Sequence, residues 1–135
     1  MKSTRLFLLF ALIALAGSAL AIEPLKISET TETEVYLKAD TIRRNGDEVS
    51  FFLIFNLKKD SVYNGEKFKS FTSFIYGNCK NKTGDQGAQV AYKGPLGTGK
   101  MIFANQGEPR DTFNVPPKLV NNYVAGVCNK ETDPK

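Results

Sequence analysis

The stretch RRNGDEVSFFLIFNL, residues 43–57, decides the fold. It contains Asn45-Gly46, a pair that strongly favours a two-residue turn with positive φ between antiparallel strands. After the turn, side chains alternate between two faces, and both faces carry apolar residues: Val49, Phe51, Leu53, Phe55 and Leu57 on one, Phe52 and Ile54 on the other. A strand that is apolar on both faces is covered on both sides. The stretch therefore predicts a central strand of a sheet, covered by a helix or by a partner subunit.

Further strands are predicted on both sides of this central one. Residues 33–38 alternate β-forming and charged side chains, which indicates a strand with one face in solvent. Strand composition returns in residues 68–79, 88–93 and 100–104. Residues 58–66 are polar and rich in turn formers, so we expect an exposed loop there.

The C-terminal part predicts one helix. Pro117 suits the first turn of a helix, and Val120, Tyr123, Val124 and Val127 recur on one face at helical spacing. Antiparallel strands followed by a helix are typical of an α+β domain. We therefore predict an α+β fold in which an antiparallel sheet of about five or six strands carries a packed C-terminal helix.

The N-terminus has the three parts of a secretory signal. Two cations precede an apolar run from Leu6 to Ala16, and Ala19-x-Ala21 offers a cleavage site. A membrane anchor is disfavoured because the apolar segment falls short of the roughly 20 residues that span a bilayer. We expect a signal peptide at residues 1–21 and a single domain at residues 22–135. No cysteine follows the cleavage site, so we expect a periplasmic or secreted protein that is not lipid-anchored.

The net charge is small. Lys and Arg number 18 against 14 Asp and Glu, which gives +4. Removal of the signal peptide, with its two cations, lowers this balance to +2. A charge this small, without a long basic run, gives little support for nucleic acid as a partner.

The segment GPLGTGKM, residues 94–101, has the spacing of a phosphate-binding loop. Met101, however, stands where such a loop needs the hydroxyl that reaches Mg²⁺. A strand is predicted to follow it, where phosphate binding needs a helix N-terminus. We therefore expect no nucleotide, and interpret the segment as a tight connection between strands with glycines at positive φ.

Side chains for the common catalytic and metal chemistries are scarce. The sequence has no histidine, which removes Ser-His and Cys-His nucleophiles and the usual zinc sites. The carboxylates are scattered, without the spacing of a calcium loop. We expect no catalytic residue, no metal and no cofactor. Ser70 or Ser73 paired with Lys69, and two carboxylates that meet in space, stay open as alternatives.

The only two cysteines are Cys79 and Cys128. An exported protein passes through an oxidising compartment, which favours a disulfide over a reactive thiol or a metal-binding pair. The predicted bridge joins the end of a strand to the helix.

A surface that mixes aromatic and basic side chains is the candidate binding site. We predict that it lies on the second face of the sheet and its loop, where Phe52 and Phe68 are also expected. The candidate binding residues are Lys58, Lys59, Tyr63, Lys67 and Lys69. Such a surface suits protein partners or anionic polymers. The alternative is that the aromatic residues belong to the core and the lysines are merely solvated.

Four segments, in their order and spacing, resemble the surface-adhesin protein E family of small exported bacterial proteins. They are VYLKADTIRRNGD (35–47), residues 70–79 ending in the first cysteine, AYKGPLGTGK (91–100), and VPP (115–117) before the helix that ends at Cys128. The resemblance implies an antiparallel sheet with a C-terminal helix tethered to it by the disulfide. It also implies a surface adhesin that binds host extracellular-matrix proteins and can pair through its sheet, without catalytic residues.

The sequence departs from the named adhesin of this family by lacking a cysteine for a lipid anchor. We therefore expect an exported, non-enzymatic binding protein of the cell envelope. Its expected partner is an extracellular-matrix or envelope protein, and a homodimer through the sheet is an expected assembly. The alternatives are a small periplasmic inhibitor of a hydrolase and a histidine-free hydrolase.

Overall fold

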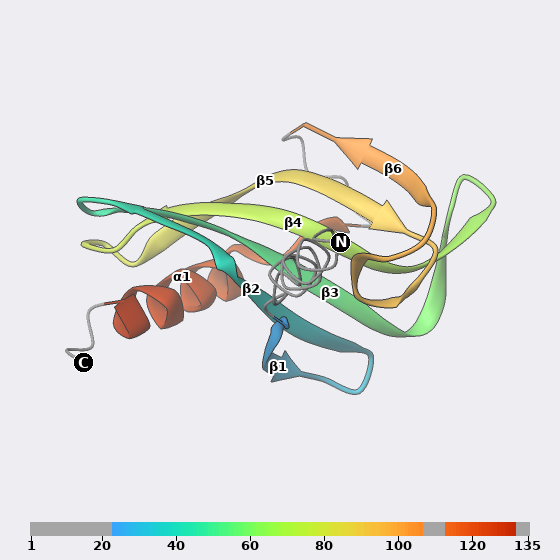
Figure 1. Cartoon of the computed structure of the whole chain (residues 1–135), viewed down its shortest axis with the longest axis horizontal. Helices are drawn as coiled ribbons and strands as arrows, with labels where there is room; N and C mark the ends of the chain where they lie inside the picture. The colour runs from blue at the N-terminus through green and yellow to red at the C-terminus, as the bar shows by residue number, and fades with distance from the viewer. Residues whose placement is uncertain (1–22, 107–112, 132–135) are drawn as a thin grey trace, which may run out of the picture.

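The computed structural model describes residues 23–106 and 113–131. They form a six-stranded antiparallel sheet and one C-terminal α-helix (Figure 1). The strands are β1 (Leu25–Glu29), β2 (Thr33–Asn45), β3 (Glu48–Tyr63), β4 (Glu66–Asn78), β5 (Thr83–Tyr92) and β6 (Met101–Asn105), and the helix is α1 (Pro117–Glu131). The strands lie in the sheet in their sequence order, and the predicted α+β fold is confirmed. The predicted signal peptide lies outside the described residues.

Two tight turns set the central hairpins. Gly46 has φ 61 between β2 and β3, as the Asn45-Gly46 pair predicts. A second turn joins β3 to β4 through Asn64 (φ 49) and Gly65 (φ 79). The predicted loop at residues 58–66 is therefore wrong, because β3 continues to Tyr63. The polar composition that suggested a loop belongs to the exposed part of this hairpin.

The core lies between α1 and one face of the sheet. Val49, Phe51, Leu53 and Phe55 of β3 are buried there, as are Val120, Val124 and Val127 of α1. The helix face predicted from the sequence is thus confirmed. The helix packs closely on the sheet at Gly84. A Cβ atom at this position would lie 2.5 Å from Val124 Cγ2, so only glycine fits here without a shift of the helix.

Two buried glutamines hold the chain that enters α1. The Nε2 atoms of Gln86 and Gln89 donate to the Phe113 carbonyl at 2.8 and 2.9 Å. The Val115 N–H donates to Gln86 Oε1 at 2.9 Å. Because buried polar groups need partners, these bonds fix where the segment before α1 meets β5.

The predicted disulfide is confirmed. Cys79 and Cys128 are bonded, with their Cα atoms 5.5 Å apart. The bridge ties the last part of α1 to the residue that follows β4. Neither cysteine is free for metal binding or for thiol chemistry.

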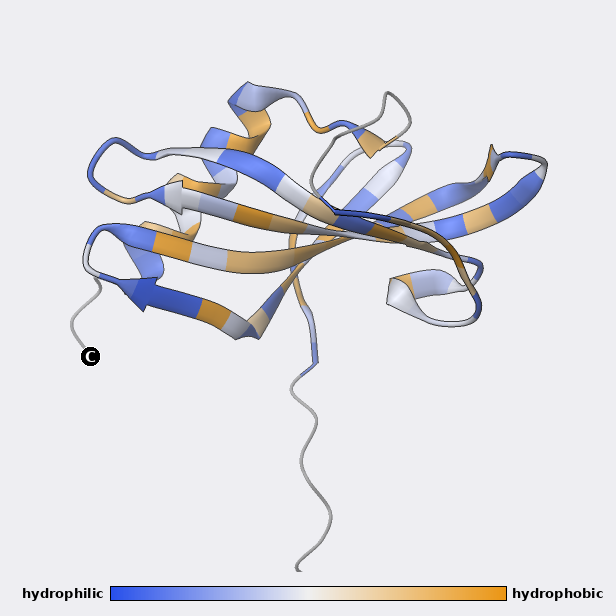
Figure 2. Ribbon diagram, turned by 90° about the horizontal axis from the view of Figure 1, so that it is seen from above, coloured by the Kyte–Doolittle hydropathy of each residue, from blue (hydrophilic) through white to orange (hydrophobic). Residues whose placement is uncertain are grey.

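The opposite face of the sheet, which we call the outer face, carries a short 3₁₀ turn, η1 (Pro95–Gly97). Figure 2 shows α1 on one side of the sheet and η1 on the other. Ser70 Oγ donates to the Gly94 carbonyl at 2.7 Å and accepts from the Gly97 N–H at 2.9 Å. Gly97 and Gly99 have φ 72 and 82. The interpretation of residues 94–99 as a strand connection with glycines at positive φ is therefore confirmed.

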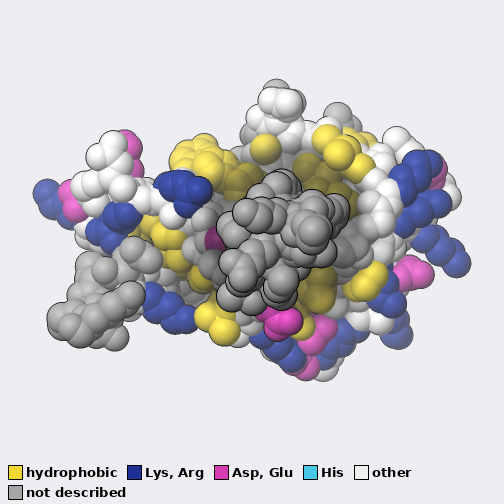
Figure 3. Space-filling model, viewed as in Figure 1, with side chains coloured by type: hydrophobic (Ala, Val, Ile, Leu, Met, Phe, Trp, Pro, Cys, Tyr) yellow, Lys and Arg dark blue, Asp and Glu magenta, His cyan; other side chains and the backbone are white. Residues whose placement is uncertain are grey.

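Aromatic side chains form a row on the outer face. The rings of Phe52 and Phe74 lie 5.1 Å apart, and Tyr76 stacks on Phe74 at 6.1 Å. Tyr76 is 47% exposed. Figure 3 shows hydrophobic side chains on this face, with Lys and Arg mainly around the edge of the view. Phe52 thus lies on the predicted face.

Candidate functional site

A wide bulge interrupts the ladder between β3 and β4. Pairing stops at Asn56 and Ser70 and resumes at Ser61 and Phe68, so residues 57–60 lie opposite Lys69 alone. Bulges bend a strand and change the direction in which side chains point. Beyond the bulge the hairpin projects from the sheet, as Figure 1 shows for the green turn between β3 and β4.

The bulge explains why Phe68 is not on the outer face. The prediction that places it there is wrong, because Phe68 is 1% exposed and its ring packs 5.3 Å from that of Phe113 in the core. The interruption of the regular alternation brings Phe68 to the helix side of the sheet.

A groove of about 560 Å³ lies beside the bulge. One wall is the turn at residues 31–33 and the other is residues 58–61, while Phe68 and Phe71 lie beneath. This volume falls within the range of roughly 300–1,000 Å³ that is typical of ligand pockets. Polar walls above aromatic rings can contact both the backbone and a side chain of a partner.

The turn between β1 and β2 is shaped by Thr30. Its Oγ1 accepts hydrogen bonds from the N–H groups of Glu32 and Thr33, at 3.2 and 3.0 Å. The wall of the groove is thus an ordered turn.

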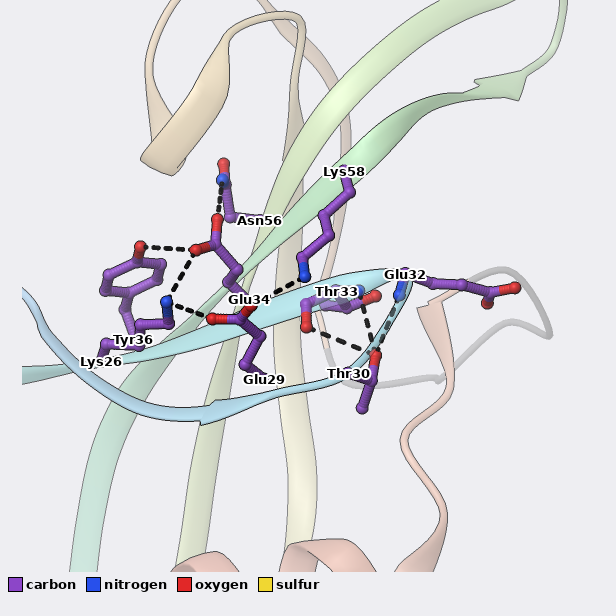
Figure 4. Close-up of polar contacts among 9 residues, drawn as sticks. All are labelled: Lys26, Glu29, Thr30, Glu32, Thr33, Glu34, Tyr36, Asn56 and Lys58. Carbon is purple, nitrogen blue, oxygen red and sulfur yellow. Dashed lines mark hydrogen bonds and ion pairs between the residues drawn. The ribbon is translucent and has the colours of Figure 1, made fainter.

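Charged side chains of β1, β2 and β3 are joined by ion pairs and hydrogen bonds (Figure 4). Lys58 Nζ lies 2.8 Å from Glu29 Oε2, and Lys26 is paired with both Glu29 and Glu34. Glu34 also accepts from Asn56 Nδ2 at 3.1 Å. We call Lys26, Glu29, Glu34, Asn56 and Lys58 the charged network.

The charged network shifts the pKa values of its members. The hydrogen bond from Lys26, followed by that from Lys58, lowers the pKa of Glu29 to about 2. Lys26 and then Asn56 lower the pKa of Glu34, and both glutamates raise the pKa of Lys26. Two lysines and two glutamates balance, so the charge of Lys58 is compensated within the chain.

The network also reaches the connection on the outer face. While its Nδ2 binds Glu34, Asn56 accepts the Leu96 N–H through Oδ1 at 2.9 Å. The backbone of η1 is therefore fixed from β3 as well as from Ser70.

A family model described as surface-adhesin protein E matches residues 25–129 of this chain. The chain belongs to the surface-adhesin protein E family. The matched residues run from the first residue of β1 almost to the end of α1. The resemblance found in the sequence is thereby confirmed.

Two solved structures of Haemophilus influenzae protein E show the same fold. One matches with a TM-score of 0.56 at 17% identity, covering 79% of this chain and 94% of that chain. A second crystal form matches with a TM-score of 0.59 at 17% identity, covering 85% and 100%. Among curated proteins, none matches this sequence.

In this adhesin E family member, the predicted binding residues occupy different environments. Lys59 is exposed in the groove wall, whereas the Lys58 ammonium is held by Glu29. Lys67 is exposed opposite Val62, and Lys69 is half-exposed beside the bulge.

Tyr63 contributes to packing. Its ring lies 4.6 Å from that of Phe103 and 5.5 Å from that of Phe113, and the side chain is half-buried. The groove therefore brings together Lys58 and Lys59, while Tyr63, Lys67 and Lys69 are not among its lining residues.

The sequence reasoning did not single out Glu29, Glu34 or Asn56. Glu29 belongs to β1, which was not predicted, although the alternation of Leu25, Lys26 and Ile27 is a weak strand signal. Within the described residues, no group of three or more His, Cys, Asp or Glu could hold a metal ion. In the same part of the chain, no helix is long and apolar enough to cross a membrane.

Proposed function

We propose that this adhesin E family member is an exported, non-enzymatic protein of the bacterial cell envelope that binds a host extracellular-matrix protein. The outer face and the hairpin that carries Lys58, Lys59, Tyr63, Lys67 and Lys69 form the proposed contact surface. Family membership supports an adhesive role. The observation that carries the proposal is the aromatic row on a sheet face that α1 leaves uncovered.

The aromatic row has the chemistry of a protein interface. Tyrosine and phenylalanine are enriched at interfaces, because each buries a large area at a low cost in side-chain entropy. Tyr76 is 47% exposed although it stacks on Phe74, so it is the expected anchor.

The lysines of the hairpin serve a different purpose. Lys59 and Lys67 are exposed, where charges affect the rate of association more than the final affinity. We assign the contact energy to the aromatic row and the electrostatic attraction of an acidic partner to these lysines.

Surface plasmon resonance on immobilised collagen, fibronectin and laminin tests the proposal. Tyr76→Ser should weaken binding at least tenfold, mainly through faster dissociation. The double variant Lys59→Glu with Lys67→Glu should slow association and reduce its dependence on salt. Lys118→Glu changes an exposed charge on α1 and serves as the control. Absence of binding to every matrix protein, or equal binding by all variants, would refute the proposal.

We also propose that two copies pair through the sheet. The outer aromatic row is apolar enough to be buried against a second copy, so pairing and matrix binding would compete for this row. Light scattering after size-exclusion chromatography should then give twice the chain mass, and Tyr76→Glu should return the protein to a monomer. A monomer at every concentration would refute the pairing.

A second candidate function is inhibition of a hydrolase, and the η1 connection favours it. Leu96 has φ 53, is 39% exposed, and is held through its backbone by Asn56. An apolar side chain presented by a fixed loop is suited to enter a cleft. Inhibition assays with lysozymes and proteases test this function, and Leu96→Gly should abolish any inhibition found.

The histidine-free hydrolase has weaker support. Glu48 and Asp85 line one open groove of about 470 Å³, but both side chains are exposed. A general acid is kept protonated at neutral pH by burial or by a close negative charge. The geometry therefore favours binding over hydrolysis.

A further inference from the structure

An apolar trench lies along α1, on the flank of the helix that faces β1. It has a volume of about 390 Å³. Leu37 and Val127 form its buried floor, while Leu25, 44% exposed, stands at its rim with Ile27. The trench lies on the helix side of the sheet, away from the outer face, and it shares no lining residue with the groove beside the bulge.

Gly126 keeps this trench open. It lies inside α1, where glycine is among the least favourable residues. A Cβ atom at this position would meet no heavy atom within 4 Å, and the backbone has no positive φ. Neither close packing nor backbone geometry therefore requires a glycine here, in contrast to Gly84. The absence of a side chain at Gly126 leaves empty space in the trench.

The trench also has a charge of one sign. Among the nine described residues that line it, two are lysines and none is acidic. The ammonium of Lys26 is already paired with Glu29 and Glu34. Lys130, in the last turn of α1, has no carboxylate partner among the described residues, and it supplies the positive charge at one end.

The length and volume of the trench indicate which kind of ligand can bind in it. From Asn122 to Lys130, α1 rises by roughly 12 Å, at about 1.5 Å per residue. An α-helix of this length, with a diameter of about 10–12 Å, needs more space than the volume of the trench offers. A single alkyl chain is narrow and apolar throughout, and a carboxylate at its end matches the lysine.

We propose that the trench binds a fatty acid, with its chain between α1 and β1 and its carboxylate at Lys130. The chain replaces water along Leu25, Ile27 and Val127, which is the source of the affinity. The carboxylate stays at the mouth of the trench, where it pairs with the ammonium and keeps contact with solvent.

Decanoate, kept below its micelle-forming concentration, is the probe. A nuclear magnetic resonance titration of the ¹⁵N-labelled protein should give saturable shifts at the amides of Gly126, Lys130 and β1. Shifts that never saturate, or that fall on the outer face, would overturn the proposal.

Gly126→Leu tests the site without harming the helix. Leucine is a better helix former than glycine, and its side chain enters the empty space. Decanoate should bind at least tenfold more weakly, while the melting temperature stays equal or rises. Lys118→Leu adds an exposed leucine elsewhere on α1 and should leave decanoate binding unchanged. Equal affinity of Gly126→Leu and the unmodified protein would contradict the proposal.

Lys130→Glu tests the position of the head group and does not depend on the glycine variant. It should weaken decanoate several-fold and strengthen decyltrimethylammonium, which has a similar chain with a positive head. A parallel change for both probes would overturn the assignment of Lys130. Matrix binding should be the same with and without decanoate, so this test and that of adhesion can fail separately.

Discussion

Removal of the disulfide is the most informative perturbation of this fold. In Cys79→Ser with Cys128→Ala, the alanine suits a position that is only 3% exposed. The bridge joins residues 49 apart in sequence. In the chain-entropy model, closing a loop of this length lowers the conformational entropy of the unfolded chain. This stabilises the folded state by about 4 kcal/mol. A domain of this size is stable by about 5–15 kcal/mol, so the double variant should lose a large part of its stability.

Urea unfolding followed by far-ultraviolet circular dichroism measures this loss. The free energy of unfolding should fall by about 4 kcal/mol, and the melting temperature by roughly 15–30 °C. Unmodified protein kept reduced throughout the experiment should give the same values, which separates loss of the bond from effects of the substitutions. A loss below about 1 kcal/mol in both samples would refute the reasoning, because the bridge would then constrain the unfolded chain too little.

Three further predictions concern packing, buried hydrogen bonds and pH. Gly84→Ala should lower the free energy of unfolding by about 1–3 kcal/mol, because the added methyl group would collide with α1. Gly126→Ala should raise the free energy of unfolding by about 0.5–1 kcal/mol, because alanine is the better helix former and its methyl group meets no other atom. The same urea experiment measures both changes. Gln86→Ala should cost about 1–3 kcal/mol because it leaves the buried Val115 N–H without its partner, while the Phe113 carbonyl keeps the hydrogen bond from Gln89, and faster exchange of the Val115 amide would report it. Glu29 has its pKa lowered from 4.5 to about 2, so the stability it contributes is complete above pH 4.5 and is lost as the pH falls toward 2. Lys26→Met should raise the midpoint of the Glu29 carboxyl titration, followed by nuclear magnetic resonance, and an unchanged midpoint would contradict the assigned cause.

The parts of the fold that depend on local patterns could be predicted from the sequence. Asn45-Gly46 and the alternation after it identified the central strand, and helical spacing from Val120 to Val127 identified the buried face of α1. β1 could not be predicted, because an edge strand of five residues contains too few alternations of apolar and polar side chains to be recognised. The hairpin at residues 58–66 was mistaken for a loop because its exposed strands are polar, which outweighed the Asn64-Gly65 turn signal.

The candidate site was harder to predict because it depends on long-range pairing. Lys58 meets Glu29, 29 residues away, only through the registers of β1 on β2 and of β2 on β3. Both registers contain irregularities that no local pattern reveals. Tyr63 likewise has an ordinary surface sequence around it, and only its contacts with Phe103 and Phe113 place its ring against the core.

The sequential order of the strands has a consequence for biogenesis. Each strand pairs with the one made just before it, so the sheet can grow hairpin by hairpin as the chain is made. The helix is made last, and Cys79 has no partner until Cys128 has followed. Oxidation of this pair therefore marks the completion of folding, and a thiol-reactive probe applied during folding would distinguish unfinished chains from finished ones.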